Sequence, residues 1–208
     1  PNEAAIGAEL DVSRTALREA FKILTAKGLI EARPKLGTRV RPRQYWNMFD
    51  TEILSWCFES KPTPKFFVSL FEVREIFEPA SAELAAKNST AEQIKLLAKA
   101  YKDMEKAKLG TDEVFSSDLN FHLCVLNATN NEFMISLGMT IQTALMGLFR
   151  LSSSIGDEYT EALPAHKAVY EAIAAGDAQG AKQAMSRLLS RSKENLDYAL
   201  TNFTGSGA

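Results

Sequence analysis

The chain has 208 residues, of which 46% are apolar, and its formal net charge at pH 7 is −2. This length suits one large domain, or a small domain joined to a larger one. The sequence has no apolar run as long as a membrane span and no signal-peptide pattern at its start, and its two cysteines do not suggest a disulfide framework. We therefore expect a cytoplasmic protein with no membrane partner.

The charge is divided unequally along the chain. Residues 1–43 carry nine lysines and arginines against five acidic residues, a net charge of +4, whereas residues 44–208 carry fifteen against twenty-one, a net charge of −6. A basic segment next to a larger acidic one indicates that only the basic segment meets a polyanion. A charge of +4 is also ordinary for a solvated surface, so the interpretation depends on the pattern of residues.

The basic segment predicts two helices in succession. Residues 2–10 form the first, and Ser13 can cap a second helix that ends at Gly28. Arg14 and Arg18 lie one turn apart on the exposed side of this second helix. Its apolar stripe, which we predict to be buried, consists of Ala16, Leu17, Ala20, Phe21 and Leu24.

Two short strands, LIEA and TRVRP, follow these helices, joined by a turn in which Gly37 can adopt positive φ. Helix, tight turn, helix and hairpin is the order of a winged helix-turn-helix, whose second helix enters the major groove of DNA. The alternative for the second helix alone is an amphipathic helix with ordinary surface arginines. The ordered combination favours the DNA-binding interpretation.

The remainder of the chain predicts only helices. A linker and a short helix occupy residues 44–64, and residues 65–202 contain helices separated by caps and short breaks, which predicts antiparallel packing in a bundle. The fold class is therefore mainly α: an N-terminal winged helix-turn-helix in residues 1–43, followed by an all-α antiparallel helical bundle. The predicted helices of the bundle are 65–87, 91–108, 112–127, 131–152, 158–175 and 177–200.

Three of these helices carry ionisable side chains on their apolar stripes. Asp118 and His122 lie one turn apart, while Arg74 and His166 lie on the stripes of other helices. An acid and two histidines can hold a divalent metal, and the fork of an arginine can bind both oxygens of a carboxylate. The structural alternative is that the histidines are hydrogen-bonded core residues and that Arg74 pairs with Asp118.

The stretch PNEAAIGAELDVSRTALREAFKILTAKGLIEARPKLGTRV resembles the DNA-binding domain of the GntR family of bacterial transcription regulators. It differs from the family pattern at Ala4, where arginine is usual, and the family has one more helix before the segment that Pro1 begins. We therefore expect the segment that begins at Pro1 to bind DNA poorly, even where the native protein binds it well. The residues that the resemblance assigns to operator DNA are Ser13, Arg14, Thr15, Arg18, Lys35 and Gly37.

The stretches LFEVREIFEPASAELAA, DLNFHLCVLNATNNEFM and AHKAVYEAIAAGDAQGAKQAM resemble the FCD effector domain of the FadR subfamily. In many members an aspartate and three histidines hold a divalent metal, such as zinc, that helps to bind a small organic acid. Asp118, His122 and His166 match three of these metal ligands, while Leu188 replaces the fourth. The site could thus hold metal or bind the acid without it. The residues predicted to bind the effector are Arg74, Asp118, His122, Arg150, His166 and Asn195.

The segment YWNMFDTEILSW is similar to regulators of sugar-acid catabolism, nearest the repressors of galactonate operons. We therefore predict a transcription regulator, a repressor, that binds operator DNA as a homodimer and a sugar acid as effector. One alternative is a metal-dependent enzyme acting on a hydroxy acid. The sequence shows no nucleophile motif, which favours a protein that is not an enzyme. A third interpretation is a structural interaction module.

Overall fold

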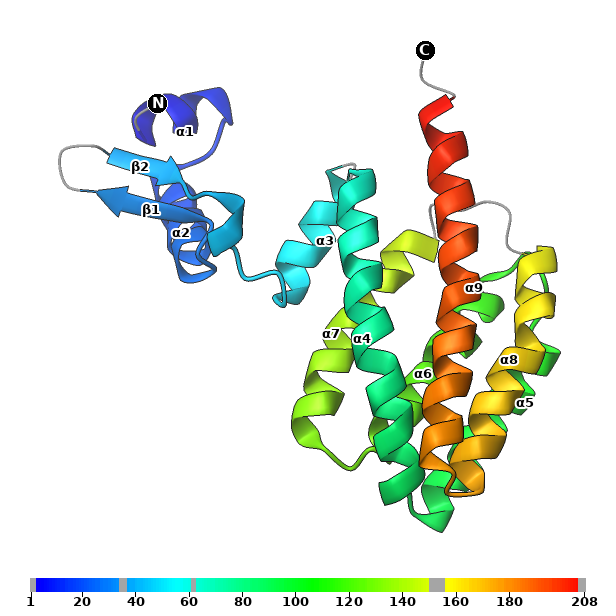
Figure 1. Cartoon of the computed structure of the whole chain (residues 1–208). Coiled ribbons are helices and arrows are strands. Elements are labelled where there is room, and N and C mark those ends of the chain that lie inside the picture. The colour runs from blue at the N-terminus through cyan, green and yellow to red at the C-terminus, as the bar shows by residue number, and fades with distance from the viewer. Residues whose placement is uncertain (1–2, 34–36, 61–62, 150–155, 206–208) are drawn as a thin grey trace. The chain divides into compact units, whose positions relative to one another are not determined.

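The structure is a computed structural model, and helices dominate it (Figure 1). It describes residues 3–33, 37–60, 63–149 and 156–205. Within these ranges no helix combines the length and the apolar character needed to cross a membrane. In chain order the elements are α1 (Glu3–Glu9), α2 (Arg14–Ala26), β1 (Ile30–Arg33), β2 (Gly37–Val40), the 3-10 turn η1 (Arg43–Tyr45), α3 (Thr51–Glu59), α4 (Pro64–Asn88), α5 (Ala91–Lys106), α6 (Asp112–Ala128), α7 (Glu132–Phe149), α8 (Gly156–Ala174) and α9 (Ala178–Gly205).

The chain divides into two compact units, which we call the head (residues 1–56) and the body (residues 57–208). In the head, Ser13 caps α2 by accepting a hydrogen bond from the backbone N–H of Ala16 at 3.2 Å. Gly28 ends α2 with a φ of +74°, and β1 then pairs antiparallel with β2. The predicted winged helix-turn-helix order is confirmed.

The predicted buried stripe of α2 is only partly correct. Leu17 is buried, and Phe21 and Leu24 are partly buried, but Ala16 and Ala20 are exposed. The reason is the small size of the elements that pack on α2, since α1 has seven residues and each strand has four. Such short elements cover a narrower part of a helix surface than the sequence pattern suggests.

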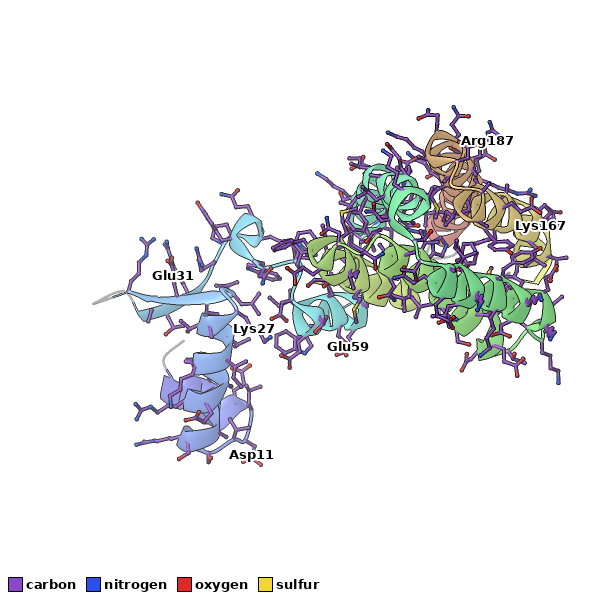
Figure 2. All side chains as sticks on the ribbon, turned by 90° about the horizontal axis from the view of Figure 1, so that it is seen from below. Asp11, Lys27, Glu31, Glu59, Lys167 and Arg187 are labelled. Atoms are coloured by element: carbon purple, nitrogen blue, oxygen red, sulfur yellow. The ribbon has the colours of Figure 1, made fainter. Side chains whose placement is uncertain are left out.

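Lys27 lies just past the end of α2, where Figure 2 labels it, and it connects α2 to the start of α3. Its Nζ lies 2.6 Å from Asp50 Oδ2 and 2.6 Å from Glu52 Oε2. Asp50 also accepts hydrogen bonds through Oδ1 from the backbone N–H groups of Glu52 and Ile53. One carboxylate thus caps α3 and holds the lysine that follows α2.

In the body, α4 packs mainly against α9 and α6, α8 packs against α9, and α5 packs against α6 (Figure 1). The predicted helices of the bundle are confirmed, with ends that differ by a few residues; residues 150–152 of the prediction lie outside the described residues. The caps are those that the sequence indicates. Thr90 and Gln93 form a capping box before α5, and Gly176 ends α8 with a φ of +69°.

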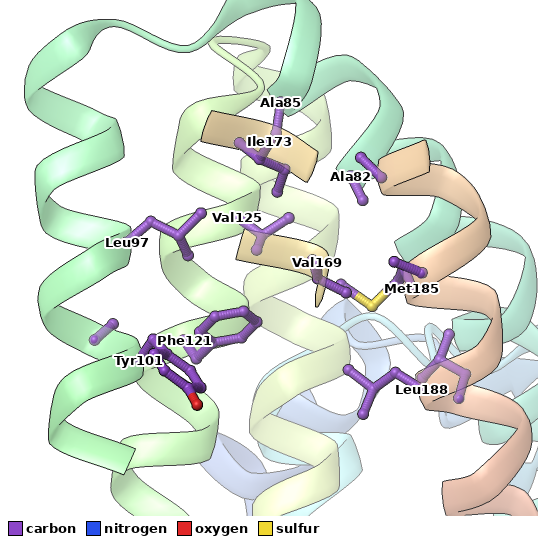
Figure 3. Close-up of a cluster of buried hydrophobic side chains, with 14 of the residues drawn as sticks. Ala82, Ala85, Leu97, Tyr101, Phe121, Val125, Val169, Ile173, Met185 and Leu188 are labelled. Atoms are coloured by element: carbon purple, nitrogen blue, oxygen red, sulfur yellow. The ribbon is translucent and has the colours of Figure 1, made fainter. Parts of the chain in front are cut away.

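An apolar core fills the space between these helices (Figure 3). Phe121 and Val125 of α6 lie in it, together with side chains from α4, α5, α8 and α9. Leu188 of α9 is also part of this core and is 2% exposed. The position where the FCD pattern has a histidine is therefore occupied in this chain by a packed leucine.

Candidate functional site

The helices α4, α6 and α8 each bring ionisable side chains into the interior of the body. We call these five residues the polar cluster: Arg74, Glu78, Asp118, His122 and His166. In four of them the side chain is 4% exposed or less, while that of Asp118 is 16% exposed. The structure thus brings together four residues that the sequence singled out, and adds a fifth.

Asp118 lies between the two histidines. Its Oδ1 is 3.1 Å from Nε2 of His166, and its Oδ2 is 3.9 Å from Nε2 of His122. One ligand atom from each of the three residues lies within 4.8 Å of the others. In His166, Nδ1 lies 3.0 Å from the carbonyl oxygen of Ala162, one turn earlier on α8. Because a carbonyl can only accept, Nδ1 carries the proton and Nε2 is the nitrogen that faces Asp118.

Arg74 is paired with Glu78 of its own helix and not with Asp118. Its Nε lies 2.5 Å from Glu78 Oε1 and its Nη2 lies 3.5 Å from Oε2. Oε2 of the same carboxylate lies 2.9 Å from Nδ1 of His122. The sequence interpretation missed Glu78, although its spacing of four residues from Arg74 in EVREIFE indicates an intrahelical ion pair.

Both carboxylates of the polar cluster are ionised. Burial on its own would raise the pKa of Glu78, but Arg74 and His122 outweigh this effect and lower it to about 2. Burial would likewise raise the pKa of Asp118, but a hydrogen bond from His166 and the positive charges of protonated His122 and His166 and of Arg74 lower it to about 2. Burial lowers the pKa of His122, yet Glu78 and Asp118 raise it further than burial lowers it. With neutral imidazoles, the cluster carries one positive and two negative charges.

The donor set fits a divalent metal ion. Nε2 of His166 is buried and has no hydrogen-bond partner in the described structure. It faces an ionised carboxylate oxygen at 3.1 Å, and two acceptor atoms at this distance repel each other unless a proton or a metal ion lies with them. Nitrogen and oxygen ligands lie about 2.0–2.2 Å from zinc, so two ligands of one ion lie about 3–3.5 Å apart.

The remaining predicted positions are less informative. Leu188 cannot ligate, and Ser192 of α9 donates its hydroxyl hydrogen to the Leu188 carbonyl oxygen at 3.1 Å. Arg150 lies outside the described residues, as does the side chain of Asn195. In the part of the body that the structure describes, three residues that could ligate a metal ion come from α6 and α8.

The DNA-binding residues predicted on α2 are exposed. Arg14 and Thr15 occupy the first turn of the helix, and Arg18 lies one turn further on. Ser13 is exposed as well, and its side-chain oxygen is engaged in capping the helix. A helix N-terminus that presents N–H groups and two arginines is suited to contacts with phosphates and base edges.

The strands β1 and β2, which form the wing, carry further basic residues that surround one acidic residue. Glu31 of β1 lies 2.6 Å from Arg39 of β2 and 3.2 Å from Arg33 of its own strand. Gly37 begins β2 with a φ of +78°, which a residue with a side chain rarely adopts. Lys35 lies outside the described residues. Glu31 thus holds two wing arginines in place on the β-ribbon.

Together, these two units define a bacterial transcription regulator with a winged helix-turn-helix and a helical effector domain. Residues 1–40 match the family described as bacterial regulatory proteins, gntR family, and residues 69–191 match the FCD domain. The chain belongs to the GntR family and carries an FCD domain. It is 31% identical over 198 residues to the galactonate operon transcriptional repressor of Escherichia coli K12, covering 94% of this chain and 86% of that protein.

Two solved structures are similar in fold to this chain. A GntR protein from Streptococcus agalactiae superposes with a TM-score of 0.53 at 27% identity, covering 93% of this chain and 88% of that one. The metal-free FCD domain of the regulator TM0439 superposes with a TM-score of 0.51 at 25% identity, covering 68% of this chain and 96% of that one.

Proposed function

We propose that the chain is a repressor that binds operator DNA through its head and binds a sugar acid in its body, through a divalent cation held by Asp118, His122 and His166. The similarity to a galactonate operon repressor over nearly the whole chain supports the class of effector. The polar cluster supports the mode of binding.

The charge of the polar cluster carries this proposal. Two ionised carboxylates face a single guanidinium, and that guanidinium is already paired with Glu78. With neutral imidazoles the net charge of −1 repels a carboxylate effector, one protonated imidazole cancels this charge, and only the protonation of both imidazoles would reverse it without a metal ion. A divalent cation changes the net charge to +1, which attracts an acid with a charge of −1.

Each residue then has a defined part in binding. Asp118 offers carboxylate oxygens, and His122 and His166 offer Nε2, while the leucine at 188 leaves coordination positions for the effector. The cation would supply a Lewis-acid anchor for the carboxylate and hydroxyl oxygens of a sugar acid. We propose Arg74, Arg150 and Asn195 as further effector contacts.

In the head, we propose that the residues predicted to bind DNA contact the operator. A palindromic operator presents two half-sites, so we propose that the chain acts as a homodimer in the cytoplasm, where the bacterial chromosome lies. The effector must bind more tightly to one of two states of the protein, because equal affinity would shift nothing. These proposed contacts are Ser13, Arg14, Thr15, Arg18, Lys35 and Gly37.

Thermal unfolding tests the effector proposal. The full chain is unfolded with a panel of sugar acids, galactonate included, before EDTA treatment, after it, and after zinc is added back. We expect one acid to raise the Tm, the increase to disappear with EDTA and to return with zinc, and the neutral sugar galactose to have no effect. An increase that survives EDTA would contradict the role of the cation, and no response to any acid would contradict the sugar-acid effector.

A further inference from the structure

We infer that Glu78 is a positioning residue for the metal site, because its carboxylate, held by Arg74, turns the His122 ring so that Nε2 faces Asp118. This inference rests on the proposed function, since it concerns the same three ligands. It assigns to α4 a part in metal binding, although α4 supplies none of these three ligands.

The two oxygens of Glu78 serve two different neighbours. Oε1 lies 2.5 Å from Nε of Arg74, and Oε2 lies 2.9 Å from Nδ1 of His122. All three side chains are buried. An ionised carboxylate attracts an N–H group, so Nδ1 is the nitrogen that carries the proton, and Nε2 on the other edge of the ring keeps its lone pair for a metal.

The His122 ring needs an external partner to hold this orientation. A rotation of 180° about its second side-chain torsion exchanges the two edges of the ring, and that torsion has only weak intrinsic preferences. Among the described residues, Nδ1 of His122 has no aligned hydrogen-bond partner, although it lies 2.9 Å from Glu78 Oε2. The contact is therefore an electrostatic one that a small ring movement can convert into a hydrogen bond.

His166 is oriented in the same way as His122, but by a different partner. Nδ1 of His166 lies 3.0 Å from the Ala162 carbonyl, and Nε2 faces Asp118. Both imidazoles therefore present Nε2 to the same carboxylate. Metal-bound histidines generally donate the other ring N–H to a carboxylate or a carbonyl, and losing such a partner typically costs 10- to 100-fold in metal affinity.

The alternative is that Arg74 and Glu78 form only a buried structural ion pair. Removing Glu78 alone does not separate the two roles, because it leaves the Arg74 charge buried and unpaired. A double variant, Arg74→Met with Glu78→Leu, removes both charges and fills similar volume, so the fold is kept while His122 loses its partner. The control is Lys87→Met with Glu83→Leu, a corresponding change at a partly exposed i,i+4 pair of α4 whose Glu83 also contacts Lys182 of α9.

Zinc titration of the metal-free full chain, followed by calorimetry, tests the inference. We expect the R74M/E78L variant to bind zinc 10- to 100-fold more weakly than the wild type while keeping its metal-free Tm, and the K87M/E83L control to bind zinc normally. Equal affinity of the wild type and R74M/E78L would overturn this inference alone. Failure of the wild type to bind zinc would overturn the proposed metal site as well.

A second readout follows the ring directly. The chain contains two histidines, so ¹⁵N labelling of histidine gives one pair of ring-nitrogen signals for each. In the metal-free wild type we expect the proton of His122 to stay on Nδ1, and in R74M/E78L we expect it to be shared between the two nitrogens. His166 is the internal control and should not change. An unchanged His122 signal in the double variant would contradict the inference.

Discussion

Nε2 of His166 and Oδ1 of Asp118 lie 3.1 Å apart, although the two residues belong to different helices and are 48 positions apart in the chain. When the imidazole is neutral and its proton is on Nδ1, both atoms are hydrogen-bond acceptors and repel each other. A proton on Nε2 or a metal ion between the two atoms removes this repulsion. A hydrogen bond from His166 is also the largest of the effects that lower the pKa of Asp118 to about 2.

Replacing Asp118 by asparagine should abolish metal binding and leave the fold intact. The amide has the shape of the carboxylate but not its charge, and it is a poor ligand, so we expect zinc affinity to fall by about 100-fold or more. Calorimetric titration measures this change. The control is Asp112→Asn on the exposed first turn of the same helix, which should bind zinc normally. Unchanged affinity in the Asp118 variant would remove Asp118 from the ligand set.

Replacing Leu188 by histidine should add a ligand at the position where the FCD pattern has one. Without metal, burying an imidazole in the apolar core should destabilise the body by about 1–3 kcal/mol. Added zinc should raise the Tm of this variant more than that of the wild type. The control is Leu189→His, since Leu189 is as buried as Leu188. This variant should lose a similar amount of stability, but zinc should not raise its Tm more than that of the wild type. Equal responses to zinc would contradict a fourth ligand position at residue 188.

Replacing Arg14 or Arg18 by alanine should weaken binding to the operator, which can be recovered by selection from random duplexes. For a base contact we expect a loss of about 1–3 kcal/mol, and for a phosphate contact a decrease of about one in the slope of log affinity against log salt. Fluorescence anisotropy at several salt concentrations measures both. Lys22→Ala, a change at a lysine paired with Glu19 on the same helix, is the control and should bind nearly normally. Wild-type affinity in both arginine variants would exclude α2 as the recognition helix.

The contact between Lys27 and Asp50 should make the stability of the full chain depend on pH. Hydrogen bonding to Asp50 raises the pKa of Lys27, and hydrogen bonding to Lys27 lowers the pKa of Asp50. The contribution of Asp50 is therefore present above its ordinary pKa of 3.8 and is lost as the pH falls through its lowered value. The contribution of Lys27 is present below 10.5 and is lost only above that pH.

Thermal unfolding of Lys27→Met tests this dependence. We expect a lower Tm than the wild type at pH 7, and we expect the difference to shrink as the pH is lowered below 3.8. Lys22→Met removes a lysine from a highly exposed pair and should change the Tm little at either pH. A difference in Tm that stays constant from pH 7 to pH 3 would show that Lys27 acts through packing instead.

Local chemistry explains why the helices and turns could be predicted from the sequence. Ser13 and Thr90 cap helices by accepting hydrogen bonds from backbone N–H groups three residues later, and Gly28 ends a helix with positive φ. These effects involve only neighbouring residues, so they can be recognised without knowing the rest of the fold. The exposure of Ala16 and Ala20 could not be predicted in the same way. It depends on how much surface the neighbouring elements cover, and periodicity carries no information about their size.

The sequence predicted most residues of the candidate site but did not show which of them contact each other. Asp118, His122 and His166 stand out because ionisable groups on apolar stripes need partners. The structural alternative that pairs Arg74 with Asp118 differs from the structure, where Arg74 pairs with Glu78, because the sequence does not give the rotation of α4 relative to α6. Glu78 lies four residues after Arg74 and so on the same face of α4, which is the sequence signal for the pair, while the contact of its carboxylate with His122 follows only from the fold.

Among the five members of the polar cluster, Asp118 is the one whose side chain stays partly exposed, at 16%. Solvent therefore reaches a carboxylate oxygen of the cluster before it reaches the imidazole nitrogens of His122 and His166, whose side chains are 4% exposed. A hydrated cation that binds here would meet the Asp118 carboxylate first, and would have to give up water before it reached the imidazole nitrogens.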